Sequence, residues 1–220
     1  MQLFDWQFAL EILPTLARAA VVTIEATFLG FAIAAVLGLV LAILRRSQNP
    51  WISSAAGGFV EFIRSTPVLI QIFFVFFVFP QFGIVIPAFT AGVMALGLHY
   101  ASYCSEVYRA GLDAIPRGQW EAARALNLSP YRTYYGVIIP QAVPPVVPAL
   151  GNYLIGMFKE TPLLSAIAVL ELMQTAKIIG SETFRYLEPI TMVGAFFLVM
   201  SLVSAAGVRR VEAWLKSRRG

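Results

Sequence analysis

The sequence predicts an all-α, polytopic membrane protein that forms one domain over residues 1–220. The first observation is composition: 59% of the residues are hydrophobic and 13% are charged, whereas soluble domains carry about 25% charged residues. The second is that several apolar runs reach the roughly 20 residues with which a helix crosses the ~30 Å hydrocarbon core. The third is that the basic residues gather in a few segments. Together these observations exclude a disordered chain and a soluble enzyme.

Five apolar stretches qualify as membrane spans. The first is the cleanest, because only Glu25 interrupts it before it ends at Arg45 and Arg46. It is too long, and lies too far along the chain, for a cleavable signal peptide. The fourth contains four prolines between Pro140 and Pro148, which predict a kinked or irregular helix. The predicted spans cover about residues 19–44, 57–80, 84–108, 136–158 and 189–208.

Residues 161–179 are apolar enough to suggest a sixth span, but they contain Glu171, Gln174 and Lys177. If they crossed the membrane, the basic tail would lie opposite the basic loop between the third and fourth spans, against the positive-inside tendency. Treated as a short re-entrant or surface helix, they leave five spans, an outside N-terminus and a cytoplasmic C-terminus. Six weaker spans are the alternative. The basic tail comprises Arg209, Arg210, Lys216, Arg218 and Arg219.

The cytoplasmic loop over about residues 112–135 has the local pattern of two short helices joined by a turn. Pro116 can open the first helix, and strong helix formers follow it. Asn127 suits a left-handed turn position. Ser129 and Pro130 then match an N-cap and the first position of a second helix. Such a compact, partly apolar pair needs a partner to bury it; the alternative is an amphipathic linker that lies on lipid headgroups.

Short motifs in and after this loop resemble a known family. Glu121-Ala122-Ala123, followed after a gap by Ile139-Pro140, resembles the EAA loop in the membrane subunits of ABC importers. The resemblance spans roughly residues 15–215 and is closest to the polar amino acid permease branch, which implies a fold like that of a type I ABC importer. The stretches that carry it are VEFIRSTPVLIQIFF (60–74), SEVYRAGLDAIPRGQWEAARAL (105–126), VIIPQAVPPVVPALGNYLIGMFKETPLLSAIAVLEL (137–172) and ETFRYLEP (182–189).

The resemblance implies that the loop is a coupling helix that docks in a groove of a separate ATPase. Glu121 would be the charged contact, with Ala122 and Ala123 small enough for close packing. An exposed acidic residue near a helix N-terminus is the alternative interpretation of Glu121. The family usually has glycine where this chain has Asn127, which still reaches the left-handed conformation. The predicted coupling residues are Gly118, Glu121, Ala122, Ala123, Asn127 and Pro140.

The energy for transport must come from another chain, because no GxxxxGK[ST] phosphate loop occurs in this sequence. The resemblance implies two permease subunits, two ATPase subunits and an extracytoplasmic solute-binding protein, in a bacterial cytoplasmic (inner) membrane. ATP and Mg²⁺ would bind the partner ATPase, and we expect no cofactor, metal or catalytic residue on this chain. The sequence does not decide whether the second permease is identical or a paralogue.

Polar and ionisable residues inside the spans are candidates for the solute pathway, because such groups are costly in lipid and face the bundle interior or water. Glu61 and Arg64 are three residues apart and could pair on one helix face, while Ser65-Thr66-Pro67 could loosen the helix. Arg64 and Lys159 could instead snorkel to an interface, and Glu61 and Glu160 could form structural ion pairs. The candidates are Glu61, Arg64, Ser65, Thr66, Gln71, Asn152, Lys159, Glu160 and Thr161.

The resemblance implies a polar amino acid or an amino-acid-derived zwitterion as the solute. The sequence is most similar to those of permeases for ectoine-type compatible solutes. A secondary transporter or channel is the alternative on composition, but no inverted internal repeat is evident. A membrane enzyme is a weaker alternative. HExxH and GxSxG are absent, and the single histidine, His99, suits a structural hydrogen bond better than catalysis.

Overall fold

The computed structural model describes residues 4–217, the side chain of Lys216 excepted, and this part of the chain contains helices but no strand. The predicted all-α fold is therefore confirmed. Arg218 and Arg219 of the basic tail lie outside the described residues. The α-helices are α1 (Trp6–Arg45), α2 (Pro50–Ser65), α3 (Val68–Phe73), α4 (Ala88–Asp113), α5 (Arg117–Ala125), α6 (Pro130–Arg132), α7 (Ile139–Glu160), α8 (Leu172–Thr183) and α9 (Leu187–Ser217).

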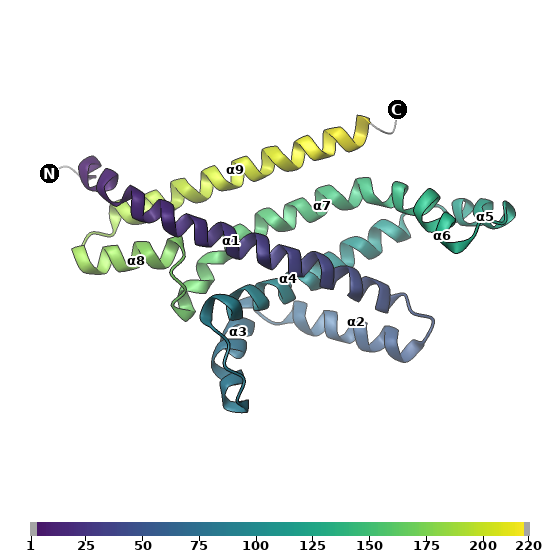
Figure 1. Ribbon diagram of the computed structural model, residues 1–220, viewed down its shortest axis with the longest axis horizontal. Helices are drawn as coiled ribbons and strands as arrows, with labels where there is room; N and C mark the ends of the chain where they lie inside the picture. The colour runs from purple at the N-terminus through teal and green to yellow at the C-terminus, as the bar shows by residue number, and fades with distance from the viewer. Residues whose placement is uncertain (1–3, 218–220) are drawn as a thin grey trace.

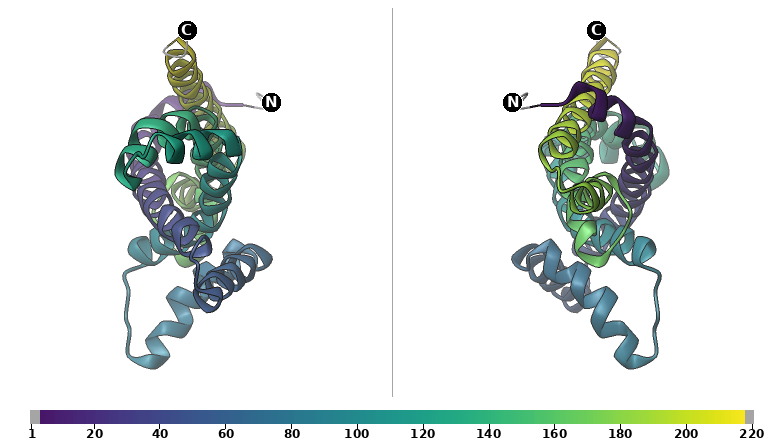
Figure 2. Two further views of the ribbon diagram at one scale, coloured as in Figure 1. Left: turned by 90° about the vertical axis from the view of Figure 1, so that its right-hand side faces the viewer. Right: turned by 90° about the vertical axis from the view of Figure 1, so that its left-hand side faces the viewer.

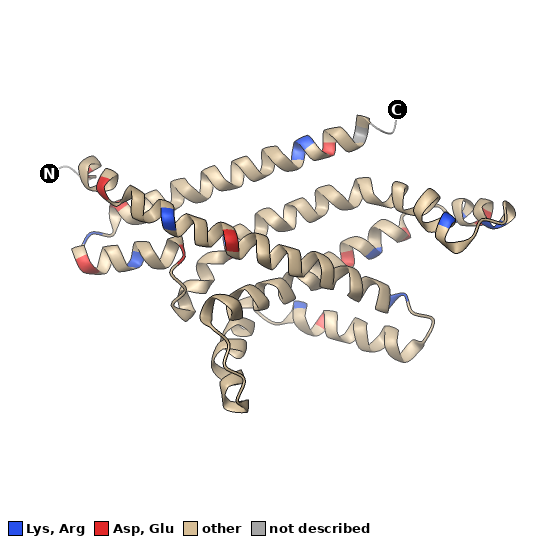
Figure 3. Cartoon of the chain, in the orientation of Figure 1, with Lys and Arg blue, Asp and Glu red and all other residues tan. Residues whose placement is uncertain are grey.

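Four long helices, α1, α4, α7 and α9, form the bundle, and the shorter helices lie around it (Figure 1). Helices α5 and α6 lie at one end, whereas α8 lies at the other end, beside the start of α1. Viewed along the bundle, α2 and α3 stand away from it on one side (Figure 2). Charged residues are absent from most of the length of α7 and α9 (Figure 3), as expected for helices in contact with hydrocarbon.

Helix α1 begins and packs according to simple rules. The Asp5 carboxylate caps it by accepting hydrogen bonds from the backbone N–H groups of Gln7 (2.9 Å) and Phe8 (3.1 Å). Its buried face consists largely of alanine, glycine and threonine, which let α4 approach closely. At Gly38 an added Cβ would lie 2.6 Å from the Cys104 Cβ, so only glycine fits this crossing.

Helix α4 is the most enclosed part of the chain. It packs against α1, α2, α3 and α7, and buried residues such as Leu96 and Ala101 run through most of its length. A helix surrounded by other helices needs less apolar surface than one that faces lipid. This explains why the helix over the predicted third span is less hydrophobic than its neighbours.

Among the described residues, three helical segments are both long and apolar enough to cross a membrane: Trp6–Arg45, Pro130–Ile167 and Leu187–Leu215. A fourth is available only if a bent pair counts as one span. In that pair, Pro50–Ser65 and Val68–Phe82 meet at an angle of 103°. The expected second span over 57–80 is therefore not one straight helix, and five spans remain a prediction.

The ambiguous segment 161–179 does not form one long helix. A 3₁₀-helix over Thr161–Ile167 ends in left-handed Ala168, and α8 follows with 12 residues. A 12-residue helix is ~18 Å long and cannot by itself cross a ~30 Å core. Glu171 caps α8 by accepting hydrogen bonds from the backbone N–H groups of Met173 and Gln174. The segment thus has the form of a short surface or re-entrant helix.

The four prolines of the predicted fourth span do not interrupt the helix. Helix α7 continues through Pro144, Pro145 and Pro148, whereas the π-helical turn over Thr133–Ile138 directly precedes it.

Candidate functional site

The loop between α4 and α7 is a compact helical hairpin at one end of the bundle (Figure 1). Asn127 adopts the predicted left-handed conformation, with φ of 51°. Its N–H donates to the Arg124 carbonyl (2.9 Å), and the N–H of Leu128 donates to that of Ala123 (3.0 Å), so the last carbonyls of α5 are satisfied. The Ser129 hydroxyl accepts from the N–H of Arg132, as expected for the cap of the second helix.

The hairpin is fixed to the bundle by a small apolar cluster. Buried Ile115, Ile138 and Ala142 form its centre, and the Trp120 ring packs edge-on against Tyr134 at 5.4 Å. Ala123 is also buried, so the second alanine of the triplet faces its own chain. A displacement of α5 must therefore carry the end of α4 and the start of α7 with it, because a well-packed cluster is hard to deform.

The opposite face of the hairpin is exposed. Glu121 and Ala122 point away from the bundle, and Leu126 and Tyr131 are 72% and 70% exposed. The space around Gly118 is open: an added Cβ would meet nothing within 4 Å. Pro140, in the first turn of α7, is exposed as well. Such a mixed acidic and apolar surface is typical of an interaction site.

A network of ion pairs lies next to the hairpin, where α1, α2 and α4 meet. Glu106 accepts from Arg45 of α1 (2.6 Å), Arg109 of α4 (2.8 Å) and Arg64 of α2 (3.5 Å). Asp113, the last residue of α4, pairs with Arg46 and with Arg109. Glu106 was not among the residues predicted from the sequence. The sequence did contain a signal for it: Glu106 lies near the cytoplasmic end of the predicted third span, and the first span ends on the same side in Arg45 and Arg46.

The sequence suggested an ion pair between Arg64 and Glu61, but the two side chains do not pair. Arg64 reaches Glu106 instead, and its guanidinium carbon lies 5.3 Å from the centre of the Tyr103 ring. Glu61 is exposed and accepts a weak hydrogen bond from Ser65 (3.5 Å). The i, i+3 spacing permitted a pair, but a neighbouring helix offers Arg64 a carboxylate that already binds two other arginines.

Gln71 and Thr66 hold the bend between α2 and α3. The buried Gln71 Nε2 lies 2.8 Å from the Ile63 carbonyl and 2.8 Å from the Thr66 hydroxyl. Thr66 has an extended backbone, which is the conformation that the following Pro67 favours. The predicted loosening at Ser65-Thr66-Pro67 thus takes the form of a sharp bend, and Gln71 serves to satisfy the carbonyls that the bend frees.

The candidates on α7 lie in different surroundings. Asn152 and Lys159 are exposed. Glu160 lies against the Tyr100 hydroxyl, and its Oε2 is buried without a hydrogen-bond partner among the described residues. Thr161 is buried and donates to the Phe158 carbonyl, so its bond is internal.

Three tyrosines connect these groups across α4 and α7. The Tyr103 ring lies 5.6 Å from Tyr153, which in turn lies 6.1 Å from Tyr100. The rings of Tyr100, Tyr103 and Tyr153 thus form an aromatic face that both Arg64 and Glu160 contact. Gln71 and Thr161 instead donate hydrogen bonds to backbone carbonyls. These tyrosines were not among the residues predicted from the sequence: Tyr100 and Tyr103 are three residues apart in HYASYCSEVY (99–108), whereas Tyr153 comes from another helix. His99 stacks near Tyr103, and its Nδ1 has no hydrogen-bond partner in the described part of the chain.

Known proteins resemble this chain over nearly all of its length. Residues 34–217 match the family described as binding-protein-dependent transport system inner membrane component. The chain is 48% identical to the probable amino-acid ABC transporter permease of Sinorhizobium fredii, over 96% of this chain and 91% of that protein. It is 34% identical to the nopaline transport system permease of Agrobacterium fabrum, over 96% and 92% of the two chains. A crystal structure of an amino acid ABC transporter with histidines superimposes with a TM-score of 0.90 at 37% identity, covering 96% of this chain and 98% of that one.

Proposed function

Because this chain belongs to the family of binding-protein-dependent transport system inner membrane components, we propose that an external ATPase drives it through the α4–α7 hairpin. The chain is a permease subunit of an amino-acid ABC transporter, a multi-pass protein of the inner membrane and not itself an enzyme. The coupling role of the hairpin, the solute and the exact assembly are parts of the proposal.

The coupling role is carried by one observation, the division of α5 into two faces. Ala123 and Trp120 join α5 to the bundle, while Glu121, Ala122 and Leu126 point outward. A partner that binds the outward face can therefore move α4 and α7. We propose that this partner is one of two ATPase subunits, which bind ATP and Mg²⁺.

The rest of the proposed assembly is what membership of this family implies. A second permease subunit and an extracytoplasmic solute-binding protein complete the transporter. We propose five crossings, by α1, the bent α2–α3 segment, α4, α7 and α9, with the N-terminus outside. This places the hairpin and the basic end of α9 together on the cytoplasmic side, in agreement with the positive-inside tendency.

In this mechanism the permease alternates between inward-open and outward-open forms, and nucleotide in the ATPase biases the equilibrium between them. Closure of the ATPase dimer pushes on α5. The apolar cluster at Ile138 transmits the push to α4 and α7, and the ion pairs of Glu106 extend it to α1 and α2. Polar side chains on the aromatic face, near Arg64, Tyr103 and Tyr153, then become accessible to solute from the opposite side of the membrane.

The solute is a polar amino acid or a zwitterion derived from one, and an ectoine-type compatible solute is the specific candidate. Support for an amino acid or a derivative of one comes from relatives described as a probable amino-acid ABC transporter permease and a nopaline transport system permease, and from the chemistry of the aromatic face. The Arg64 guanidinium can bind a carboxylate, and Glu160 can bind an ammonium group.

Proteoliposomes that contain the whole complex test the proposed function. Uptake should require ATP inside and the binding protein outside, and it should fail with an ion gradient alone. Uptake driven by a gradient without ATP would favour a secondary transporter. Calorimetry of the binding protein with ectoine, glutamine, glutamate, arginine and histidine then identifies the solute.

A further inference from the structure

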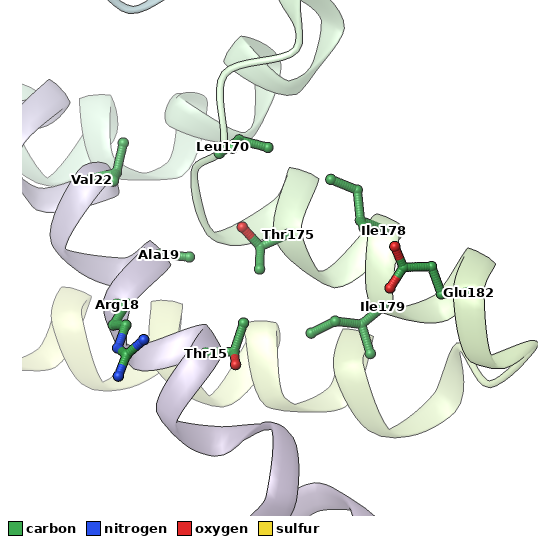
Figure 4. A pocket seen from close by; sticks show the side chains of 9 residues that line it. All are labelled: Thr15, Arg18, Ala19, Val22, Leu170, Thr175, Ile178, Ile179 and Glu182. Atoms are coloured by element: carbon green, nitrogen blue, oxygen red, sulfur yellow. The ribbon is translucent and has the colours of Figure 1, made fainter.

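A second polar site lies at the end of the bundle opposite the hairpin, in a groove between α1 and α8 (Figure 4). The groove has a volume of about 400 Å³ and draws its walls from both helices. Its apolar floor is formed by Ala19, Val22, Leu170, Ile178 and Ile179, and its polar groups are Thr15, Arg18, Thr175 and Glu182. The groove residues on α1 all lie before residue 34, where the match to the family model begins. The groove therefore includes residues outside that match.

The two charged residues of the groove face it without pairing. Arg18 comes from α1 and Glu182 from α8 (Figure 4), and both are exposed. Neither forms a hydrogen bond or ion pair with another described residue. Their neighbour Arg185 behaves differently, because it binds both Asp5 (3.1 Å) and Glu188 (2.8 Å). Opposite charges that remain apart on two walls suit a ligand that carries both a negative and a positive group.

The groove lies where the sequence predicts a membrane surface. Arg18 directly precedes the apolar run that begins at residue 19. Three exposed aromatic residues flank the helices at this end: Trp6 (75%) begins α1, and Phe184 (91%) and Tyr186 (52%) lie between α8 and α9. The start of α1 and the turn from α8 to α9 lie at the same end of the bundle (Figure 1). Exposed aromatic residues of this kind are enriched where a membrane meets water.

The surface beyond the groove is apolar apart from one acid. On α1, exposed Val21, Ile24, Phe28 and Leu29 follow Arg18 toward the middle of the helix, with exposed Glu25 among them. Acyl chains can lie along such a surface, whereas a free amino acid gains nothing from it. The apolar path from the charged groups therefore favours a lipid over a small soluble zwitterion.

We infer that the groove between α1 and α8 binds the headgroup of a zwitterionic phospholipid, with the phosphate at Arg18 and the ammonium group at Glu182. The guanidinium of arginine matches phosphate oxygens well, and charge-assisted hydrogen bonds of an ammonium group to a carboxylate are strong. The hydroxyls of Thr15 and Thr175 supply further hydrogen-bonding groups at the groove. This inference requires only that the chain spans a membrane, and it does not depend on the coupling role of the hairpin.

Bound lipid would fasten α8 to α1. The direct polar contact between them is modest: the Leu172 N–H donates to the Thr23 hydroxyl at 3.2 Å, and the apolar cluster around Leu16 and Leu172 adds packing. A headgroup that bridges both helices therefore stabilises the position of α8.

The test measures retention of lipid by the purified complex, using native mass spectrometry with added phosphatidylethanolamine or phosphatidylglycerol. Arg18→Gln and Glu182→Gln should each lower the apparent affinity for phosphatidylethanolamine about fivefold or more, as expected when one charged contact is lost. Glu11→Gln and Lys177→Gln, which change exposed charges on the same two helices outside the groove, should leave it unchanged. Equal thermal midpoints of all variants without lipid confirm that they are folded.

Three results would overturn the inference. Equal retention of phosphatidylethanolamine by groove variants and controls would show that the lipid does not occupy the groove. Equal affinity for phosphatidylglycerol would show that Arg18 acts alone and that no zwitterion is selected. Displacement of the lipid by a free amino acid would assign the groove to the solute. None of these results bears on ATP-driven coupling, so failure here is distinguishable from failure of the proposed function.

Discussion

The guanidinium of Arg45, the last residue of α1, lies 2.6 Å from the carboxylate of Glu106 in α4. Arg64 of α2 and Arg109 of α4 reach the same carboxylate. One acidic side chain thus joins three helices, ten residues before Pro116, where the hairpin begins. In the proposed mechanism a push on the hairpin enters the bundle at this junction, and the ion pairs keep the three helices moving together.

Replacing Glu106 by Gln should destabilise this junction and reduce transport. Three arginines would lose the carboxylate that they share, and the uncharged amide of glutamine cannot neutralise their positive charges. We expect a loss of about 1–3 kcal/mol in stability, since the pair is only partly buried, and a fall in solute transported per ATP hydrolysed. Thermal unfolding and parallel uptake and ATPase assays measure both. Glu61→Gln, which changes an exposed carboxylate on α2, is the control and should have little effect on stability.

Asn127→Val should weaken binding of the ATPase, because a β-branched residue at φ of 51° costs about 1–2 kcal/mol or more. Asn127→Gly should bind as well as the native chain or slightly better, since glycine adopts this conformation freely. Co-purification of the ATPase with each variant provides the measurement. If the valine variant recovers as much ATPase as the glycine variant, the turn does not control docking.

Gly38→Ala should destabilise the crossing of α1 and α4. The new methyl group would lie 2.6 Å from the Cys104 Cβ and 2.9 Å from the Ala101 carbonyl oxygen, which cannot easily move. Overpacking of this kind costs about 1–3 kcal/mol. Gly58→Ala on α2, where the added methyl meets nothing within 4 Å, is the matched control. Thermal unfolding should separate the two variants, and equal midpoints would show that the two helices are not packed this closely.

The N-terminal cap of α1 should make stability sensitive to acid. Hydrogen bonds from the Phe8 N–H, and then from Arg185, hold the pKa of Asp5 below its ordinary value of 3.8. The unfolded chain therefore binds this proton more readily, so the stabilisation is present above pH 3.8 and is lost as the pH falls through the folded pKa. Asp5→Asn should flatten the dependence of the unfolding midpoint on pH in this range. An unchanged slope would show that Asp5 does not contribute to it.

Local features of the hairpin could be predicted from sequence because their causes are local. Asn127 and the Ser129-Pro130 pair determine the turn and the cap within a few residues. The partner of Arg64 could not be predicted, because it depends on which helices become neighbours. Pro67 indicated an irregular helix, but the direction of the bend depends on Gln71, which folds back onto the Thr66 region. Glu106 acquires its role only when α1, α2 and α4 come together.

Site-directed cross-linking in the intact complex tests whether the outward face of α5 docks on an ATPase and transmits its motion. Cysteines at Glu121 or Leu126, paired with cysteines in the groove of the ATPase, should form an adduct with a short bifunctional linker, and nucleotide should change its yield. The native Cys104 is fully buried and will not interfere. Trp6→Cys, exposed at the opposite end of the bundle, should give no adduct. Absence of any adduct at Glu121 and Leu126 in complexes that still transport solute would show that α5 does not dock on the ATPase.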